Sequence, residues 1–344
     1  MTTKEKAGRL QPEKVKSFII KNNFIVAFVA LLVISSILSD SFLSARNFSN
    51  LLKQQSAALI VAFGMLFCVI TGGIDLSVGA NACLSGIILG TALVKWEWDG
   101  AAGLIGAILL AVAASCAIGT LNGVLIHCLK LPPFIVTLAM QFSIRGLANM
   151  ISNGQPIRAL TETKAYTALV SFSAPGAKVF EIPYSFLLVL VCAVILGFVL
   201  RKTSYGRLVM ATGSNAETVR LAGVRILRYQ ISVYVISGIM SGIAGVMLAS
   251  RSNVFSPTAA ADYEMNALAG AVIGGASMTG GTGSVFGTVL GVFILAMLEN
   301  VMNLMSFPPF PQQVIKGIII ILAVYLQEFT SNRKFDKKKS KAKK

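Results

Sequence analysis

The feature that most constrains this sequence is a series of apolar runs, most of about 18 residues or more, separated by short polar segments. A helical run of that length crosses the hydrocarbon core of a bilayer, because each helical residue rises about 1.5 Å. Helices also satisfy their backbone hydrogen bonds within the segment, as lipid requires. The runs lack the short alternating pattern of an outer-membrane barrel. The sequence therefore predicts an all-α, polytopic bundle of transmembrane helices with broken or re-entrant segments.

Charge is scarce in this chain, and it is concentrated. Only 13% of the residues are charged, whereas about 25% are charged in an average soluble domain. The net charge of +16 comes from three segments, residues 1–21, 201–228 and 331–344. Basic segments next to membrane spans stay in the cytoplasm, and this explanation is preferred to nucleic-acid binding, so no nucleic-acid partner is expected. The lysine-rich tail can also contact anionic membrane lipid.

Ten spans fit the apolar runs best. An even number places both termini and the central basic loop, residues 201–228, in the cytoplasm. Residues 22–330 then form one transmembrane domain, flanked by a basic N-terminal segment, 1–21, and a lysine-rich tail, 331–344. The expected spans are 24–38, 51–70, 74–94, 101–128, 134–151, 184–200, 229–250, 263–278, 285–305 and 312–325.

The central basic loop carries six basic side chains against one acid, Glu217. Its middle part, residues 214–223, is predicted to form a short helix. Ser214 or Asn215 can cap the first amides, Glu217 lies near the positive end of the helix dipole, and Gly223 can end the helix. A capped helix in a cytoplasmic loop is a candidate docking element for a partner.

Two glycine-rich polar segments, 71–79 and 274–284, interrupt the apolar runs. Irregular backbone at membrane depth persists only where protein groups or a water-filled path provide hydrogen-bond partners for its free amides and carbonyls. Tight cytoplasmic turns and re-entrant segments both fit these two stretches. The four-residue spacing of Gly283, Gly287 and Gly291 favours close helix packing over ligand binding.

Polar side chains within the apolar runs mark a candidate translocation path. Asp75 is the most notable, because a carboxylate near the bilayer is costly unless it is paired, hydrated or functional. Asp75 either caps the following helix by binding its own backbone amides or takes part in gating or substrate passage. Glu299 and Asn303 share a helical face, which should point into the bundle. The candidate set is Asp75, Ser77, Gln141, Arg145, Asn149, Glu264, Asn266, Glu299 and Asn303.

Several common motifs are absent from the sequence. It contains no G-x-x-x-x-G-K-[ST] phosphate loop, and no G-x-S-x-G or H-E-x-x-H hydrolase motif. The one histidine, His127, stands alone at the end of a span, and no cysteine spacing is typical of a metal site. We therefore expect no catalytic residues, metal or cofactor in this chain.

Three stretches together resemble the ribose-type permease subunits of bacterial ABC monosaccharide importers. They are GGIDLSVGA, GSNAETVRLAGV and YEMNALAGAVIGGASMTGGTGSVFGTVLG, and the resemblance extends over nearly the whole chain. It implies a multi-pass protein of the bacterial inner membrane. The implied partners are a cytoplasmic ABC ATPase that binds ATP and Mg²⁺, a periplasmic sugar-binding protein, and a second permease subunit, most simply another copy. The central basic loop resembles the coupling helix of this family, which implies ATPase contacts for Gly213, Asn215, Glu217, Arg220 and Gly223.

The sequence departs from the family pattern at two positions. Ribose-type members usually have an acid at the position of Asn266 and tend to have an amide at that of Glu299. Ribose is therefore one candidate substrate beside galactose, xylose, inositol and the furanose-like autoinducer-2. An ion-coupled secondary sugar transporter, with Asp75 and Glu299 as proton or sodium sites, is the alternative. An intramembrane enzyme is disfavoured because no nucleophile–base or metal set is present.

Overall fold

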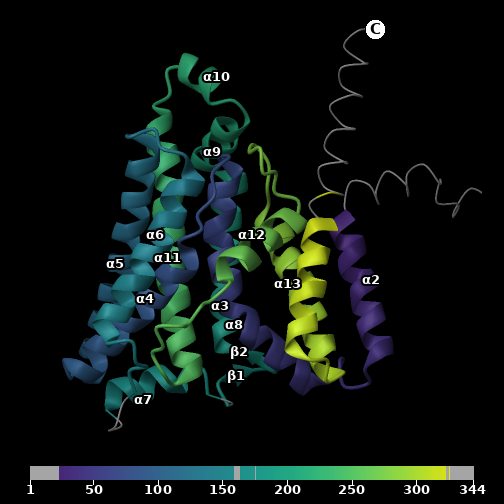
Figure 1. Cartoon of the computed structure of the whole chain (residues 1–344). Helices are drawn as coiled ribbons and strands as arrows, with labels where there is room; N and C mark the ends of the chain where they lie inside the picture. The colour runs from purple at the N-terminus through teal and green to yellow at the C-terminus, as the bar shows by residue number, and fades with distance from the viewer. Residues whose placement is uncertain (1–22, 159–162, 175, 323–324, 326–344) are drawn as a thin grey trace, which may run out of the picture.

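The computed structural model describes residues 23–158, 163–174, 176–322 and 325. Helices make up most of this part of the chain, and one two-stranded hairpin joins two of them (Figure 1). The all-helical class expected from the apolar runs is confirmed. The predicted basic segments, 1–21 and 331–344, lie outside the described residues.

The elements follow one another along the chain with short connections. The helices are α2 (Asn23–Leu38), α3 (Ala45–Ile70), α4 (Val78–Gly90), α5 (Gly100–His127), α6 (Pro133–Ser152), α7 (Lys164–Ser171), α8 (Tyr184–Lys202), α9 (Ser204–Ser214), α10 (Ala216–Leu221), α11 (Ile226–Ser252), α12 (Tyr263–Ile273) and α13 (Val285–Leu304). A π-helical turn, η1 (Thr91–Lys95), extends α4, and β1 (Lys178–Val179) pairs antiparallel with β2 (Ile182–Pro183). A further apolar helix, Pro309–Leu322, follows α13.

Among the described residues, seven helices are long and apolar enough to cross a bilayer. They correspond to the predicted spans two to seven and nine, so a multi-pass membrane protein is confirmed. Two further helices are apolar but shorter: α2, whose apolar part is Phe24–Leu38, and the helix Pro309–Leu322. The count of ten spans and the cytoplasmic position of the termini remain predictions.

The predicted eighth span, 263–278, is the clearest correction. Only α12 is helical in this region, and its 11 residues rise about 16 Å, roughly half of a hydrocarbon core. The chain approaches α12 through a largely non-helical segment, 253–262, whose Phe255 pairs with Ile157 in an isolated bridge. After α12, Gly275 adopts a φ of +93° and ends the run. The helix therefore ends where the glycine-rich segment 274–284 begins, five residues before the predicted end of this span.

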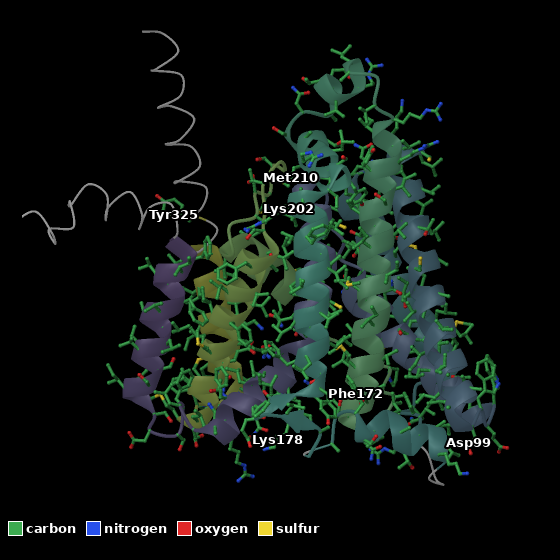
Figure 2. All side chains as sticks on the ribbon, turned by 180° about the vertical axis from the view of Figure 1, so that it is seen from behind. Asp99, Phe172, Lys178, Lys202, Met210 and Tyr325 are labelled. Carbon is green, nitrogen blue, oxygen red and sulfur yellow. The ribbon has the colours of Figure 1, made fainter. Side chains whose placement is uncertain are left out.

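The molecule has two distinct ends. Helices α9 and α10 lie at one of them, and α7 and the β1–β2 hairpin lie at the other (Figure 1). Figure 2 shows Lys202 and Met210 toward the first end, and Asp99, Phe172 and Lys178 at the second. We call these the α10 end and the hairpin end. The distribution of basic residues predicts that the α10 end faces the cytoplasm.

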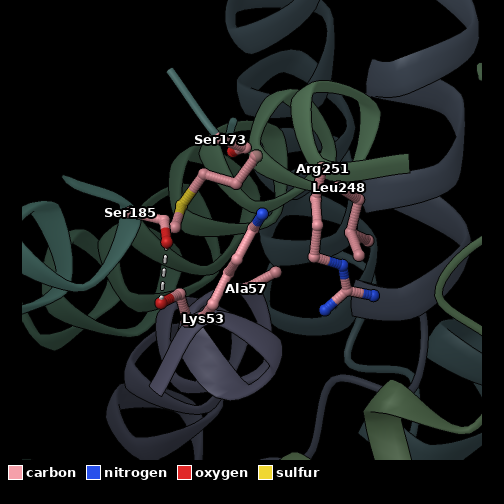
Figure 3. Close-up of a pocket in the computed structure, with 8 residues that line it drawn as sticks. Lys53, Ala57, Ser173, Ser185, Leu248 and Arg251 are labelled. Atoms are coloured by element: carbon pink, nitrogen blue, oxygen red, sulfur yellow. Dashed lines mark hydrogen bonds between the residues drawn. The ribbon is translucent and has the colours of Figure 1, made fainter. Parts of the chain in front are cut away.

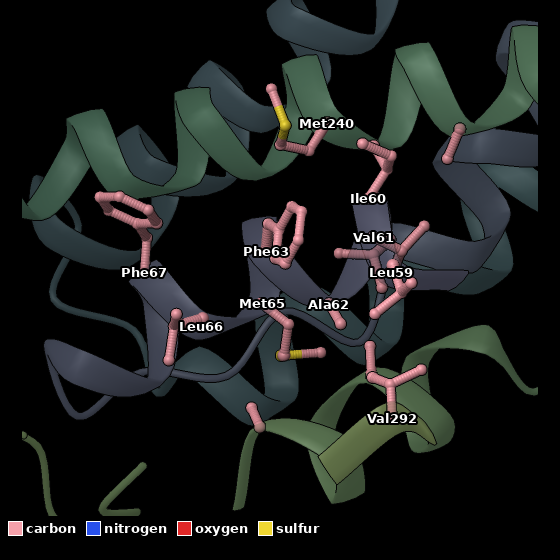
Figure 4. Packing of buried hydrophobic residues seen from close by; sticks show 14 of the residues in the cluster. Leu59, Ile60, Val61, Ala62, Phe63, Met65, Leu66, Phe67, Met240 and Val292 are labelled. Carbon is pink, nitrogen blue, oxygen red and sulfur yellow. The ribbon is translucent and has the colours of Figure 1, made fainter. Parts of the chain in front are cut away.

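Helix α3 forms the centre of the bundle. Its residues from Leu59 to Ile70 are buried on every side, as is typical of a helix that is apolar all round. Met240 of α11 covers one side of Phe63, and Val292 of α13 packs near Leu59 from another side (Figure 4). The outward faces of α5, α6 and α8 instead expose large apolar side chains, which suit contact with lipid.

Close contacts between glycines bring several helices together. Gly119 of α5 lies against Gly238 of α11, where an added Cβ would be 3.0 Å from the Cα of Gly238. On α13, Gly287 packs against the backbone of Gly274, and Gly291 packs against that of Gly270. The expectation that the small residues of this helix serve packing is therefore confirmed.

Candidate translocation site

The break between α3 and α4 positions the first group of polar residues. Two hydrogen bonds close a tight turn after α3, from the amide of Gly72 to the carbonyl of Val69 and from that of Gly73 to Cys68, both 2.9 Å. Gly72 has a φ of +78°, which glycine adopts without strain. The segment that follows carries Asp75 and Ser77 to the start of α4. This geometry agrees with the tight-turn interpretation of 71–79.

Asp75 is buried, with 2% of its surface exposed, among neutral donors. Its Oδ1 accepts hydrogen bonds from the backbone amide of Ser77 at 3.1 Å and from the Ser77 hydroxyl at 2.6 Å. Its Oδ2 accepts one from the hydroxyl of Ser237 on α11 at 2.7 Å. The amide of Asn122 on α5 donates to the Ser77 hydroxyl at 2.8 Å and approaches Asp75 Oδ1 at 3.5 Å.

These contacts give Asp75 a clear structural role. The contact with the amide of Ser77 agrees with the predicted binding to its own backbone amides, although Ser77 precedes the first helical residue. Asp75 takes part in none of the ion pairs of the described residues. Hydroxyl and amide groups donate the hydrogen bonds that the carboxylate needs. Through Asn122 and Ser237, these bonds connect the α3–α4 break to α5 and α11. Asn122 and Ser237 were not among the predicted path residues, although both are polar residues within apolar runs.

Glu264 forms a second polar group in the first turn of α12, and it is 5% exposed. The side-chain amide of Gln141 on α6 donates to its Oε1 at 2.8 Å. Its Oε2 is buried and has no hydrogen-bond partner among the described residues. A Cβ added to Gly79 would overlap this oxygen, so the carboxylate lies directly against the first turn of α4.

Arg145 lies one helical turn after Gln141 on α6 and holds the segment that leads into α12. Its Nη1 donates to the carbonyl oxygens of Pro257 at 3.1 Å and Ala259 at 2.7 Å, both in the non-helical segment 253–262. Three of the predicted path residues, Gln141, Arg145 and Glu264, therefore meet where α6 contacts the start of α12. Asp75 and Glu264 flank the same helix N-terminus, whose dipole favours negative charge.

The other path candidates lie away from this group or contribute little to it. Asn149 is exposed, and its amide donates to the backbone carbonyl of Arg145 within α6. Asn266 is partly buried, and its Oδ1 has no hydrogen-bond partner among the described residues.

Glu299 and Asn303 require a correction to the expected common path. Lys316 of the last apolar helix forms an ion pair with Glu299 at 2.6 Å, and Gln312 donates to Asn303 at 2.9 Å. The polar face of α13 therefore pairs with the helix that follows it and not with Glu264. The spacing of Glu299 and Asn303 revealed their shared face but could not identify the partner of that face.

The central basic loop contains the helix predicted for it. In α10, Asn215 is the N-cap, and its side chain accepts a hydrogen bond from the amide of Thr218 at 2.9 Å. Glu217 and Arg220 form an exposed ion pair at 2.6 Å, and hydrogen bonding to Arg220 lowers the pKa of Glu217. Gly223 follows with a φ of +80°. The helix, the Asn215 cap and the glycine stop are confirmed.

The loop also contains a helix that was not predicted, α9. Its N-cap, Thr203, accepts a hydrogen bond from the amide of Gly206, and this threonine was the available sequence signal. Gly213, expected to contact a partner, lies near the end of α9 and packs against the backbone of Ile70 and Gly281. Gly213 is half-buried at this contact, directly before α10 in the chain.

Two hollows lie toward the hairpin end. A narrow crevice with no room for a ligand has Lys53, Ser185 and Arg251 among its lining residues (Figure 3). A cavity of about 140 Å³ lies between α4, α11 and the segment 253–262, with Cys83, Gly245 and Ala259 in its wall. This cavity adjoins the segment held by Arg145. The described residues contain no group of His, Cys, Asp or Glu side chains that could hold a metal ion.

Comparisons with known proteins point to one family. Residues 47–324 match the family described as "Branched-chain amino acid transport system / permease component". The chain is 38% identical to the ribose import permease protein RbsC of Bacillus subtilis, over 86% of this chain and 89% of that protein. It is 36% identical to the L-arabinose transport system permease protein AraH of Escherichia coli, over 93% and 91%.

A third relative is the L-arabinose permease protein AraH of Azospirillum brasilense, which is 34% identical over 91% of this chain and 89% of that protein. No solved structure matches the chain. Both the family match and these identities extend over most of the spans, the central basic loop and the α12 region. The chain therefore belongs to the permease family of the branched-chain amino acid transport systems.

Proposed function

We propose that this chain is the membrane-spanning permease subunit of an ATP-driven monosaccharide importer in the bacterial inner membrane. Its similarity to ribose and arabinose permeases over most of its length is the observation that carries this proposal. A separate cytoplasmic ABC ATPase binds ATP and Mg²⁺ and supplies the energy. The permease has no catalytic step of its own and alternates between outward-open and inward-open states, which the ATPase binds with different affinity.

The ATPase docks on α10 in this proposal. Three features support the assignment: the helix is exposed, its N-terminus is capped by Asn215, and Glu217 and Arg220 present opposite charges on its surface. Leu221 adds an apolar side chain that is 76% exposed at the end of the helix. An apolar residue beside a charged pair is a fitting contact surface for a groove on a partner.

The sugar passes the start of α12 in this proposal. The cavity of about 140 Å³ is lined in part by the segment that Arg145 holds, and the Gln141–Glu264 pair lies one turn of α6 away from Arg145. Carboxylate, amide and guanidinium groups are suitable partners for sugar hydroxyls. Because Glu264 is packed against α4, the path opens only when α12 moves. Few contacts suffice, since a tight site in the membrane would slow release.

Two further partners complete the proposed importer. A sugar-binding protein delivers substrate at the hairpin end, and a second permease subunit, most simply another copy of this chain, completes the membrane core. Ribose and L-arabinose are the first sugars to test, because the relatives described above are named as ribose and L-arabinose permeases. Asn266 and Glu299, which depart from the ribose-type pattern, leave the choice between these and other monosaccharides to experiment.

The first test is purification of the chain from its native membrane in mild detergent, followed by identification of the proteins that accompany it. We expect an ATPase with a phosphate loop, and we expect Glu217→Arg to lose it, because the reversed charge repels Arg220 and disrupts the docking surface. Glu181→Arg is the matched control. Glu181 forms the same kind of exposed ion pair, with Lys178, at the opposite end of the molecule, so this variant should keep the ATPase.

The second test is sugar uptake by the reconstituted complex in vesicles. Uptake of ribose or L-arabinose that needs ATP and the binding protein, and that persists without an ion gradient, supports the importer. A chain that purifies alone and takes up sugar only under a proton or sodium gradient would overturn it. That result would support the ion-coupled transporter and direct attention to Asp75 and Glu299.

A further inference from the structure

Three loops that lie far apart in the sequence meet next to the docking helix. They are the end of α3 at Ile70–Gly72, the end of α9 at Gly213–Ser214, and the tip of the α12–α13 connection at Gly280–Gly281. The amide of Gly281 donates to the carbonyl of Ile70 at 2.8 Å. We call this meeting point the glycine junction.

The junction depends on backbone contacts without intervening side chains. A Cβ on Gly213 would overlap the carbonyl oxygen of Ile70 and lie 2.8 Å from the amide nitrogen of Gly281. A Cβ on Gly280 would lie 2.6 Å from the carbonyl oxygen of Gly213 and 3.0 Å from the amide nitrogen of Gly72. Gly280 and Gly281 also have φ values of +86° and +82°, which other residues rarely adopt.

Each loop of the junction continues directly into a functional part of the molecule. Gly213 is two residues before Asn215, the cap of α10. Ile70 is five residues before Asp75 and ends the central helix α3. Residues 274–284 connect α12, which carries Glu264, with α13. Hydrogen bonds from Ser277 to Thr282 and from Gly280 to Ser277, both 3.0 Å, keep this connection compact.

We propose that the glycine junction carries movement of the docking helix to α12, and that Gly213 is the positioning residue of this link. The proposal rests on the proposed function, since the movement originates in a partner ATPase. The hydrogen bond from Gly281 to Ile70 and the close backbone contacts leave no free space between the three loops. A close-packed contact of this kind transmits displacement, so the three loops move as one body. A displacement of α9 and α10 then shifts the 274–284 connection, and α12 withdraws Glu264 from Gly79.

The decisive variant is Gly213→Ala, because its Cβ has to separate α9 from the other two loops. We expect the ATPase to co-purify and hydrolyse ATP, while the amount of sugar transported per ATP falls about tenfold. Gly146→Ala on α6 is the control, since an added Cβ meets nothing within 4 Å there. Normal transport per ATP in Gly213→Ala would overturn the proposal. Loss of the ATPase from this variant would also overturn it, because Gly213 would then only set the docking helix.

A milder variant is needed in case Gly213→Ala does not fold. At Gly283 an added Cβ would meet the flexible side chains of Ile70 and Leu66, at 2.8 and 2.9 Å, and these can shift. Gly283→Ala should therefore fold and lower the transport per ATP by a smaller factor than Gly213→Ala. Unchanged transport per ATP in a correctly folded Gly283→Ala would count against the link.

Hydrogen exchange of the purified chain tests the junction without any partner. Gly213→Ala, or Gly283→Ala in its place, should speed amide exchange in 70–75 and 274–284 relative to Gly146→Ala. Unchanged exchange in 274–284 would overturn the proposal even if the chain is a sugar importer. Conversely, faster exchange in a chain that purifies without an ATPase would refute the proposed function and keep the junction as a mechanical unit.

Discussion

The side-chain amide of Gln141 on α6 lies 2.8 Å from the carboxylate of Glu264 on α12, 123 positions further along the chain. The second carboxylate oxygen rests against Gly79 of α4. One buried side chain therefore holds the half-length helix α12 against two other helices. In a permease, this contact is a candidate for the closed position of the path.

The first prediction concerns Glu264. Glu264→Ala leaves the amide of Gln141 without its acceptor and should lower the free energy of unfolding by about 2 kcal/mol. Glu264→Gln keeps an acceptor of the same shape and should cost clearly less. Thermal unfolding of the detergent-purified variants measures this difference. Equal losses in both variants would mean that the negative charge, and not the hydrogen bond, stabilises α12.

The second prediction concerns Asp75. Asp75→Ala removes the acceptor for the hydroxyls of Ser77 and Ser237 in a buried site, which should cost about 3 kcal/mol. Asp75→Asn should fold and keep the ATPase bound but reduce uptake, because the tie between the α3–α4 break and α11 weakens. Combining Asp75→Ala with Ser237→Ala should cost less than the sum of the two single losses. Release of the ATPase by Asp75→Asn would instead place Asp75 in the docking surface.

The third prediction concerns the cap of α10. Asn215→Ala loses the hydrogen bond to the amide of Thr218, and it should destabilise this short helix by about 1 kcal/mol and weaken ATPase binding several-fold. Asn215→Asp keeps a capping oxygen and should bind the ATPase normally. Binding assays with the purified ATPase compare the two. Equal affinities for both variants would show that the cap does not order the docking helix.

The fourth prediction is a pH dependence at the same helix. Hydrogen bonding to Arg220 lowers the pKa of Glu217, so the contribution of this ion pair is present above the ordinary pKa of a glutamate. It is lost only as the pH falls through the lowered value. ATPase binding should therefore be constant between about pH 6 and pH 8. A marked change in that range would assign the interaction to another titrating group.

The fifth prediction separates the importer from the ion-coupled alternative. Glu299 is paired with Lys316, so Glu299→Gln should lower the melting temperature by a few degrees and leave ATP-driven uptake near the wild-type rate. Lys316→Met should have a similar small effect. Loss of uptake in Glu299→Gln, with the ATPase still bound, would make Glu299 part of the transport path.

The sequence by itself predicted the seven helices that are long and apolar enough to cross a membrane, but it also predicted a full span where the structure has the short helix α12. Apolar length indicated the helices α3, α4, α5, α6, α8, α11 and α13, because burial in lipid depends on composition and length. The cap at Asn215 and the stop at Gly223 were equally visible, since both act within one turn of α10. These are local effects, which depend only on residues that are close together in the sequence.

The partners of the polar residues became visible only from the packing of the helices. The tertiary structure placed Gln141 with Glu264, gave Asp75 the hydroxyl of Ser237, and paired Glu299 with Lys316. It also showed that Gly213, which the sequence predicted to contact the ATPase, packs against the backbone of Ile70 and Gly281. Such contacts join residues that are far apart in the chain, and their partners depend on how the helices pack. Hydrophobic periodicity orients one helix but does not choose its neighbour.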